Sequence, residues 1–347
     1  MDISKTDRNF AVQTSLDLDG LRFYNIREAH FSLYGVFWEN GQYRRLPEQV
    51  ARSVSQGVND VHTHTAGGRV KFITDSPFVA IHAVMPAVGR MSQFALTGSG
   101  GFDLYVGKKE EYYAAFIPPS GISDGYESVI RFGDSREREI TVNFPLFSMV
   151  AELYIGLEKN AVVKQSSGYK HKKPIVFYGS SITQGGCASR PGNAYASMIS
   201  RALQIDYVNL GFSGSAKGEE EIAQYIKGLD MSAFVYDYDH NAPTLRHLEE
   251  THRRMFWTVR ESNPDLPILI LARPAWRLDQ EEKQRLAVIQ RTYTEAIAAG
   301  DRNVYLIDGA ALMKYARNDG TSDGCHPNDL GFYSMAKSLI RRLKDLI

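Results

Sequence analysis

A serine in a glycine-containing turn is the first candidate for chemistry in this sequence. Residues 179–183 (GSSIT) directly follow the apolar run 175–178. A serine between a strand and a helix is exposed, and N–H groups at the helix start can stabilise an oxyanion. The same residues also suit a simple Ser/Thr helix cap, so this motif alone leaves both interpretations open.

An aspartate and a histidine near the C-terminus form the second candidate. Asp323 stands three residues before His326, after the last apolar run of the chain. In a tight turn, the carboxylate can hold the imidazole tautomer and stabilise its charged form. A helix cap beside a solvated histidine would look the same. Both motifs lie at strand ends in the second half of the chain. This favours Ser181 as nucleophile, His326 as base and Asp323 as the residue that orients His326.

The elements that position these residues alternate in the second half of the chain. Buried apolar strands between amphipathic helices predict a parallel sheet covered on both faces. Ligands of such sheets bind beyond the carboxyl ends of the strands. The predicted strands are 175–178, 207–210, 234–238, 268–272 and 304–307, and the predicted helices are 194–203, 219–227, 245–260, 280–299 and 330–346.

The first half has the pattern of short strands, with almost no convincing helical pattern before residue 165. The runs 69–73 and 78–84 flank Asp75-Ser76-Pro77 and predict a hairpin. Short strands separated by turn residues indicate a β-sandwich or jelly roll. Further predicted strands are 21–26, 101–106, 112–117, 127–132, 139–144 and 146–157.

A polar segment separates the two halves. Residues 158–173 are mostly polar, and Pro174 follows them directly. At 347 residues the chain is long enough for two domains. We therefore predict a β-sandwich or jelly-roll domain over 1–165 and an α/β domain over 166–347.

These motifs resemble those of the SGNH, or GDSL-type, esterase and lipase superfamily. Its Gly-Asp-Ser-Leu motif corresponds to residues 179–182, and its Asp-x-x-His motif to Asp323 and His326. In the first half, residues 101–105 (GFDLY) resemble a Gly-x-Asp-Leu-Tyr motif that marks a β-domain in one branch of the superfamily. The resemblance covers nearly the whole chain and implies a three-layer, flavodoxin-like α/β catalytic domain.

The resemblance also implies the donors of an oxyanion hole. A family glycine corresponds to Gly214, which we favour over Gly211, and a family asparagine corresponds to Asn241. Together with the N–H of Ser181, these residues would bind the oxyanion.

The sequence departs from the family pattern at two places. Ser180 replaces the aspartate of Gly-Asp-Ser, and residues 239–242 (DHNA) replace Gly-x-Asn-Asp. These changes leave the nucleophile, base and donors in place but put substrate preference in doubt. The α/β-hydrolase fold is set aside, because its Gly-x-Ser-x-Gly elbow would need glycine where Thr183 stands.

The resemblance implies a serine esterase without a cofactor. We expect it to hydrolyse a small acyl ester, acetyl in particular, on a small molecule or carbohydrate through an acyl-enzyme on Ser181. Two alternatives stay open: an acyltransferase with the same site, and a non-catalytic carbohydrate-binding protein.

Other polar residues have weaker claims to function. Arg273 follows the fourth predicted strand of the α/β half and would either bind an anionic or sugar-like substrate or form a salt bridge. His62 and His64 lack a nearby carboxylate or cysteine cluster, so we place them at the surface or a strand edge and expect no metal. We expect a structural role for Asp103 and a packed thiol at Cys325.

Composition excludes several classes of protein. The net charge is +0, from 40 basic and 40 acidic residues, which argues against bulk binding of nucleic acid or anionic membranes. The two cysteines are too few for a disulfide scaffold. No apolar run reaches the roughly 18 residues of a membrane span. We expect a cytoplasmic protein, or a periplasmic or secreted one if a leader was removed, and the sequence does not indicate its oligomeric state.

Overall fold

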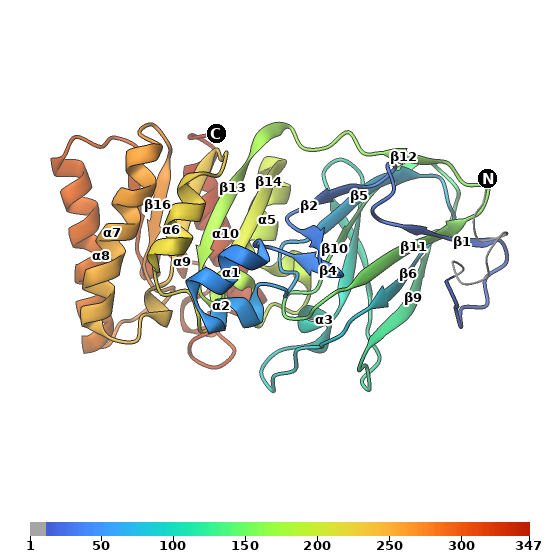
Figure 1. Ribbon diagram of the computed structural model, residues 1–347, viewed down its shortest axis with the longest axis horizontal. Coiled ribbons are helices and arrows are strands. Elements are labelled where there is room, and N and C mark those ends of the chain that lie inside the picture. Colours follow the sequence, from blue (N-terminus) through green and yellow to red (C-terminus); the bar gives the residue numbers. More distant parts are fainter. Residues whose placement is uncertain (1–11) are drawn as a thin grey trace.

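A computed structural model of the protein describes residues 12–347. Two parts follow one another along its long axis, a sheet covered by helices and a sandwich of sheets (Figure 1). The chain enters through the sandwich and ends in the helical part, as the residue patterns predict.

The helical part is built on one parallel sheet of five strands in the order β14-β13-β15-β16-β17. This order is the flavodoxin-like one, in which the chain turns to opposite sides of the first strand. The carboxyl ends of β13 and β15 therefore flank the point where a site forms. The strands are β13 (His171–Gly179), β14 (Ile205–Gly211), β15 (Ala233–Asp237), β16 (Ile268–Leu271) and β17 (Val304–Ile307).

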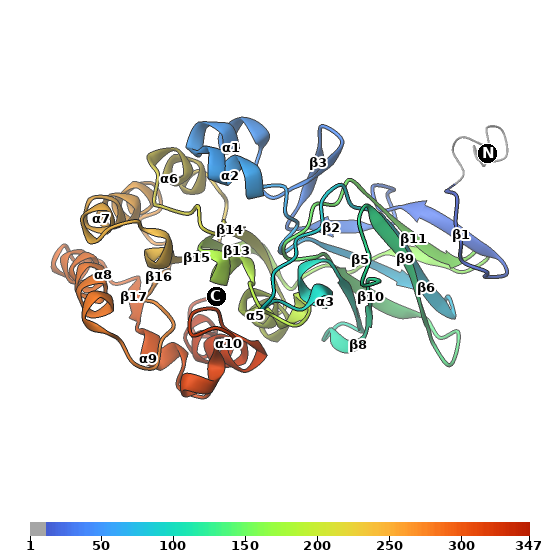
Figure 2. The same cartoon turned by 90° about the horizontal axis from the view of Figure 1, so that it is seen from below.

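Helices cover both faces of this sheet (Figure 2). On one face lie α6 (Glu220–Lys227), α7 (Leu245–Ser262) and α8 (Gln280–Ala298), and on the other lie α5 (Tyr195–Leu203) and α10 (Asp329–Leu343). The expected three-layer α/β architecture is confirmed. Shorter helices are α4 (Ser181–Gln184), α9 (Gly309–Leu312), η3 (Pro191–Asn193), η4 (Asp239–Asn241) and η5 (Arg317–Gly320).

The N-terminal part is a sandwich of two antiparallel sheets, as expected. Apolar side chains of both sheets pack into one core between them. One sheet has the order β1-β11-β6-β9, and the other β12-β5-β10-β7-β8, with β2 also paired to β5; β3 and β4 pair with each other in a separate two-stranded sheet. The strands are β1 (Leu21–Asn25), β2 (Ser32–Tyr34), β3 (Phe37–Glu39), β4 (Gln42–Arg44), β5 (Arg69–Thr74), β6 (Phe78–Val84), β7 (Phe102–Val106), β8 (Glu111–Phe116), β9 (Gly125–Arg131), β10 (Arg138–Asn143), β11 (Glu152–Glu158) and β12 (Val163–Gln165).

The predicted hairpin between 69–73 and 78–84 is wrong. Strands β5 and β6 belong to different sheets, and the chain crosses between the sheets at the turn that joins them. Pro77 has no N–H for a hairpin bond, and its carbonyl accepts instead from the N–H of Phe132 at 2.7 Å. The hydroxyl of Ser76 accepts from the N–H of Glu158 at 3.0 Å, which fastens the crossing to β11.

Between residues 12 and 165, three short helices occur where the sequence shows almost no convincing helical pattern. Helices α1 (Glu48–Val54), α2 (Gln56–Val61) and α3 (Leu96–Ser99) lie in this stretch. They are too short for a clear helical period, yet Ala51, Val54 and Val58 pack into the core on the α6 side of the parallel sheet. The division at residue 165 stays a prediction, because α1 and α2 precede it in sequence but pack with the part that follows it.

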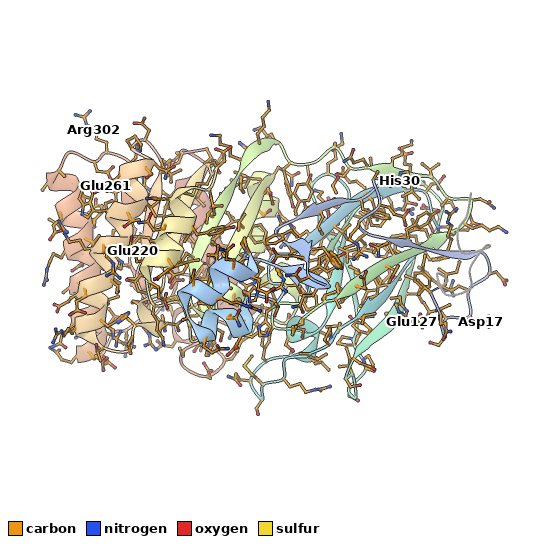
Figure 3. All side chains as sticks on the ribbon, in the orientation of Figure 1. Asp17, His30, Glu127, Glu220, Glu261 and Arg302 are labelled. Atoms are coloured by element: carbon orange, nitrogen blue, oxygen red, sulfur yellow. The ribbon has the colours of Figure 1, made fainter. Side chains whose placement is uncertain are left out.

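Charged side chains of both signs cover the outside of the molecule. Glu261 and Arg302 are exposed at the helical end, and Asp17 and His30 at the sandwich end (Figure 3). Within residues 12–347, none of the helices has the length and apolar character needed to cross a membrane.

Candidate active site

The nucleophile candidate stands at a turn that its neighbours define closely. Strand β13 ends at Gly179, where a Cβ would lie 2.1 Å from the carbonyl oxygen of Asp237, so only glycine fits. The hydroxyl of Ser180 caps α4 by accepting from the N–H of Ile182 at 3.1 Å. Ser180 is therefore the helix cap, and Ser181, the first residue of α4, has a hydroxyl free for another partner.

Ser181, His326 and Asp323 form a continuous hydrogen-bonded chain. Ser181 Oγ lies 2.9 Å from His326 Nε2, and His326 Nδ1 lies 2.8 Å from Asp323 Oδ2. The other carboxylate oxygen of Asp323 accepts from the backbone N–H groups of His326 at 2.8 Å and Cys325 at 3.0 Å. The two motifs, 145 residues apart in sequence, meet here in the geometry of a nucleophile, a base and a group that orients the base.

The hydrogen bonds to Asp323 favour its ionised form. Partial burial works to raise its pKa, but hydrogen bonds from the backbone and ring of His326 and from Cys325 outweigh burial and lower the pKa to about 2. An ionised carboxylate accepts the Nδ1 proton of His326, which leaves Nε2 free to accept the hydroxyl proton of Ser181.

Of the two candidate glycines, only Gly214 has an N–H free to bind an oxyanion. Its φ is +68°, and none of the hydrogen bonds found over residues 12–347 uses its N–H. The N–H of Gly211 instead donates to the side chain of Asn209 at 2.9 Å. A Cβ at Gly211 would lie 2.2 Å from the backbone nitrogen of Gln184, so Gly211 is needed for close packing against α4.

Asn241 occupies the end of η4, directly beyond β15. Its side-chain amide donates to the carbonyl oxygen of Phe212 at 3.1 Å, two residues before Gly214. This bond uses one of the two amide hydrogens and leaves the other available. The N–H of Ser181 is available as well, because it lies in the first turn of α4.

Gln184 is a residue of this site that the sequence did not reveal. It is fully buried, and its side-chain oxygen accepts from the N–H of Ser213 at 3.0 Å, next to Gly214. Its amide nitrogen donates to the carbonyl of Leu146 at 3.0 Å and lies 3.1 Å from His64 Nδ1. One side chain thus joins α4, the glycine turn and the segments that precede residue 165. A single glutamine outside any motif carries no signal for such contacts.

Arg45 was missed in the same way. Its guanidinium lies 5.0 Å from the ring centre of Phe212, and burial lowers its pKa to about 9, so it stays charged near neutral pH. The group approaches the end of β14 from the sandwich side and fixes it by charge-assisted hydrogen bonds. Its acceptors are the carbonyl oxygens of Val61, His64, Asn209 and Gly211.

Arg273 lies beside the site but is engaged in an ion pair. Its Nε is 3.0 Å from Glu282 Oε1, and its backbone N–H donates to Asp239 at 3.2 Å. Burial raises the pKa of Asp239 to about 6. A role for Arg273 in substrate binding stays a prediction. A polar cavity of about 140 Å³ is lined by Asp239, His240, Arg273, Asp279, Glu281, Glu282 and Arg285.

His62 and His64 were expected at the surface or a strand edge, and this expectation is wrong for His62. Its side chain is almost completely buried, with Nε2 2.7 Å from Arg44 and Nδ1 2.7 Å from the carbonyl oxygen of Asn59. His64, part of an isolated β-bridge, turns to Gln184 instead. The two imidazoles have separate partners and do not form a pair for a metal.

One group of residues has the ligand types of a metal site. Ligand atoms of Cys187, Asp323 and His326 lie within 4.8 Å of one another. Burial raises the pKa of the Cys187 thiol to about 11 in the metal-free chain. His326 is already bonded through both ring nitrogens, so we assign the group to the hydrogen-bonded chain with Ser181 rather than to a metal.

Comparison with known proteins identifies the family. A model of the GDSL-like lipase/acylhydrolase family matches residues 172–344, and a model of the GxDLY N-terminus of SGNH-type esterases matches residues 21–163. The chain belongs to the SGNH, or GDSL-type, hydrolases. It is therefore an ester hydrolase of this type and carries the GxDLY N-terminal part expected from the sequence.

Solved structures agree with this SGNH assignment. A GDSL-like lipase from Bacteroides ovatus matches 94% of this chain and 98% of its own, at 28% identity and a TM-score of 0.83. The salicylyl-acyltransferase SsfX3 of a tetracycline biosynthetic pathway matches over 95% and 98%, at 18% identity and a TM-score of 0.76. The acetyl xylan esterase Est2A from the rumen bacterium Butyrivibrio proteoclasticus matches over 93% and 98%, at 12% identity and a TM-score of 0.59. The last two share the fold alone. No curated protein sequence matches the chain.

Proposed function

We propose that the protein hydrolyses small acyl esters, acetyl esters in particular, through an acyl-enzyme on Ser181. The observation that carries the proposal is the unbroken chain from Ser181 Oγ through His326 to Asp323, beside the unpartnered N–H of Gly214. A nucleophile with an oriented base and adjacent oxyanion donors is the arrangement that acyl transfer requires.

In the acylation step, His326 Nε2 takes the proton of the Ser181 hydroxyl while Oγ bonds to the ester carbonyl carbon. The carbonyl oxygen becomes an oxyanion, which accepts from the N–H groups of Ser181 and Gly214 and from the Asn241 amide. When the ester C–O bond breaks, the imidazolium of His326 gives its proton to the leaving alkoxide. The products of this half-reaction are the alcohol and the acyl-enzyme.

In the deacylation step, His326 removes a proton from water, and the resulting hydroxide attacks the acyl carbon. The same donors hold the second oxyanion. Its collapse breaks the bond to Ser181 Oγ while the imidazolium of His326 returns its proton to Oγ, which releases the carboxylic acid and restores the Ser181 hydroxyl. Asp323 keeps its charge throughout and stabilises the imidazolium that forms twice in each cycle.

The preference for an acetyl group is supported by the fold shared with an acetyl xylan esterase, and Gly186 lies close to the proposed nucleophile and base. A Cβ placed on Gly186 would lie 3.1 Å from the carbonyl oxygen of Ser181, 3.4 Å from the ring of Phe147 and 3.5 Å from His326 Cδ2. A sugar alcohol as the leaving group is supported by the fold shared with an acetyl xylan esterase. Arg273 is the residue we propose for contact with that alcohol.

Labelling by a fluorophosphonate tests the nucleophile. The wild-type chain and Ser180→Ala should both acquire one phosphonyl group, located on Ser181 by peptide mapping, whereas Ser181→Ala should acquire none. Labelling of Ser181→Ala at the wild-type rate would contradict the assignment. Rates on p-nitrophenyl esters of increasing chain length, and then on acetylated sugars, should be highest for acetyl.

Acyl transfer to an alcohol other than water is a second candidate, because the fold is shared with a salicylyl-acyltransferase. Product analysis with acetyl ester substrates and added sugar alcohols separates the two. Free acetate as the main product supports hydrolysis, and acetylated acceptor as the main product supports transfer.

A further inference from the structure

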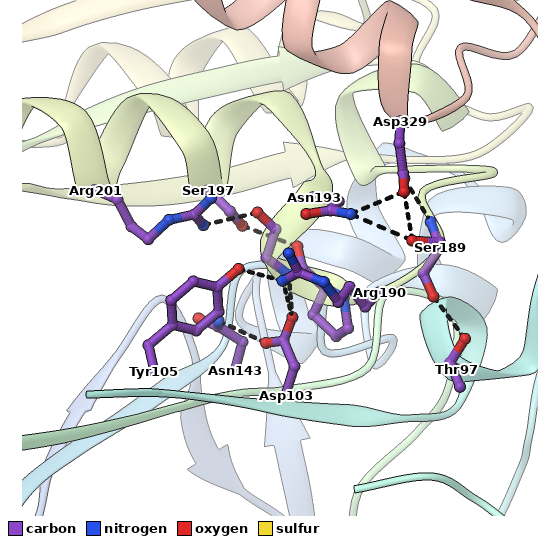
Figure 4. Close-up of polar contacts among 12 residues, drawn as sticks. Thr97, Asp103, Tyr105, Asn143, Ser189, Arg190, Asn193, Ser197, Arg201 and Asp329 are labelled. Atoms are coloured by element: carbon purple, nitrogen blue, oxygen red, sulfur yellow. Dashed lines mark hydrogen bonds and ion pairs between the residues drawn. The ribbon is translucent and has the colours of Figure 1, made fainter. Parts of the chain in front are cut away.

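The segment 188–193 connects the nucleophile helix α4 to α5 and runs between the sandwich and the N-terminus of α10 (Figure 4). It holds no reacting group of the proposed mechanism. Yet it accepts or donates hydrogen bonds on both of its sides, and each side meets one buried or half-buried carboxylate. These two carboxylates are Asp103 of the sandwich and Asp329 of α10.

On the sandwich side, Asp103 is fully buried on β7 and holds the segment with one oxygen. Its Oδ2 accepts from the N–H of Gly192 at 2.8 Å and from Arg190 Nη1 at 3.0 Å. Its Oδ1 accepts from the amide of Asn143 at 2.7 Å. A Cβ on Gly192 would lie 2.0 Å from the hydroxyl oxygen of Tyr105, so the segment packs directly on this strand. Asp103 therefore cannot reach a substrate.

On the side that faces α10, Asp329 forms hydrogen bonds with the same segment. Its Oδ1 accepts from the N–H of Ser189 at 2.8 Å, and its Oδ2 accepts from the Ser189 hydroxyl at 2.5 Å and the Asn193 amide at 2.8 Å. Asp329 is the first residue of α10 and follows His326 by three positions. The position of the segment is thereby coupled to the turn that carries the proposed base.

The segment also begins beside the reacting pair. Gly186, two residues before it, is the residue whose added Cβ would lie 3.5 Å from His326 Cδ2. The hydroxyl of Thr97, in the part before residue 165, donates to the carbonyl of Ser189 at 2.6 Å and fixes the segment from a second point. A shift of the segment would therefore move both the backbone at Gly186 and the turn that carries His326.

We propose that Asp103, the aspartate of the Gly-x-Asp-Leu-Tyr sequence, is a positioning residue for the Ser181–His326 pair and acts through residues 188–193 and Asp329. The proposal rests on the proposed esterase function. It gives this aspartate a role in catalysis rather than in carbohydrate binding, because its oxygens are occupied by protein donors.

Asp103→Asn tests the proposal, because it keeps the size of the side chain and removes the charge that pairs with Arg190. We expect kcat on an acetyl ester to fall about tenfold to a hundredfold, since small misplacements of reacting groups cost up to about that much. The rate of fluorophosphonate labelling of Ser181 should fall in parallel, while KM changes less than kcat. Should this variant fail to fold, Arg190→Gln replaces it, with the same expected loss.

Glu110→Gln is the matched control. Glu110, in the turn between β7 and β8, forms an ion pair at 2.7 Å with Lys71 of β5, and both side chains are almost fully buried. Loss of this ion pair in Glu110→Gln should lower the melting temperature and leave kcat within twofold of wild type. If Asp103→Asn changes kcat no more than Glu110→Gln does, the aspartate only stabilises the fold and the proposal is overturned.

A double-mutant cycle with Asp329→Asn tests the route. If both carboxylates act through residues 188–193, the double variant should lose less in kcat than the product of the two single losses. A loss equal to that product would overturn the coupling. Ser181→Ala separates this proposal from the proposed function: full activity there removes the esterase mechanism, whereas wild-type kcat for Asp103→Asn with inactive Ser181→Ala removes only the positioning role.

Discussion

The two parts of the molecule contribute to the site in different ways. The groups assigned to bond making come from the α/β part, where Ser181, Gly214 and Asn241 follow three strand ends and His326 precedes α10. The chain before residue 165 supplies none of them. It supplies side chains such as Arg45 and Asp103, whose partners are the end of β14 and the segment 188–193.

This difference separates reactivity from geometry. Removing a reacting group removes a step of the reaction. Removing a residue that only positions the reacting groups leaves every step possible, with poorer alignment. We therefore expect a graded series of effects, largest within the α/β part and smaller for contacts that cross from the sandwich side. Each prediction below tests one level of that series.

The largest effect is expected at Ser181 and His326. Alanine at either position should lower kcat on p-nitrophenyl acetate by about 10⁶-fold, as in serine hydrolases that lose nucleophile or base. Ser180→Ala is the matched control, since Ser180 only caps α4, and it should lose less than tenfold. A Ser180→Ala variant as inactive as Ser181→Ala would break the assignment of the two hydroxyls.

The next effect is expected at the oxyanion donors. Asn241→Ala should lower kcat by about 10²–10³-fold, or about 2.7–4 kcal/mol, because one donor to the oxyanion is lost in the transition state. KM should change little, since the ground-state carbonyl gains less from this donor. Asn241→Asp, which replaces the donor by a negative charge, should be at least as damaging; unchanged kcat in both variants would contradict the role of Asn241.

The α/β part was more predictable from the sequence than the sandwich. Parallel strands bring their carboxyl ends to one edge, so residues after three strands and before the last helix had to lie together. Ser181 and His326 follow this rule although 145 residues separate them. The crossing at Pro77 has no such rule, because strands β5 and β6 are both mostly buried and their pattern does not state which sheet each joins.

The buttressing contacts were unpredictable for a related reason. Gln184 and Arg45 are single polar residues whose partners are mainly backbone groups, and any residue offers a backbone carbonyl or N–H. The helices α1 and α2 carry few apolar residues each, so their place against the parallel sheet emerges only from tertiary packing. Sequence patterns therefore locate the chemistry better than they locate the contacts that align it.

A smaller effect on activity is expected at Gln184, where the two parts meet. Gln184→Met keeps the volume but leaves the N–H of Ser213 and the carbonyl of Leu146 without this partner. We expect kcat to fall about tenfold through a looser glycine turn, and the free energy of unfolding to fall by about 1–3 kcal/mol. Gln224→Met, on the exposed side of α6, is the control and should change neither. A stability loss with unchanged kcat would show that the turn does not depend on Gln184.

The smallest effect on activity is expected at His64, because Gln184 keeps its bond to Leu146 when this imidazole is lost. His64 instead gives the interface a pH dependence. Burial, followed by the charge of Arg45, lowers its pKa to about 4, below the ordinary value of 6.5. Between these values the unfolded chain binds the proton and the folded chain does not, so the free energy of unfolding falls as pH is lowered from 6.5 to 4 and levels off below 4. The shift corresponds to on the order of 3 kcal/mol at most.

Urea unfolding midpoints between pH 6.5 and 4 should therefore fall less steeply for His64→Gln than for wild type. His30→Gln, at an exposed residue of the sandwich part, should keep the wild-type slope. Equal slopes for all three chains would mean that His64 is protonated in the folded state, where its Nδ1 could no longer accept from Gln184.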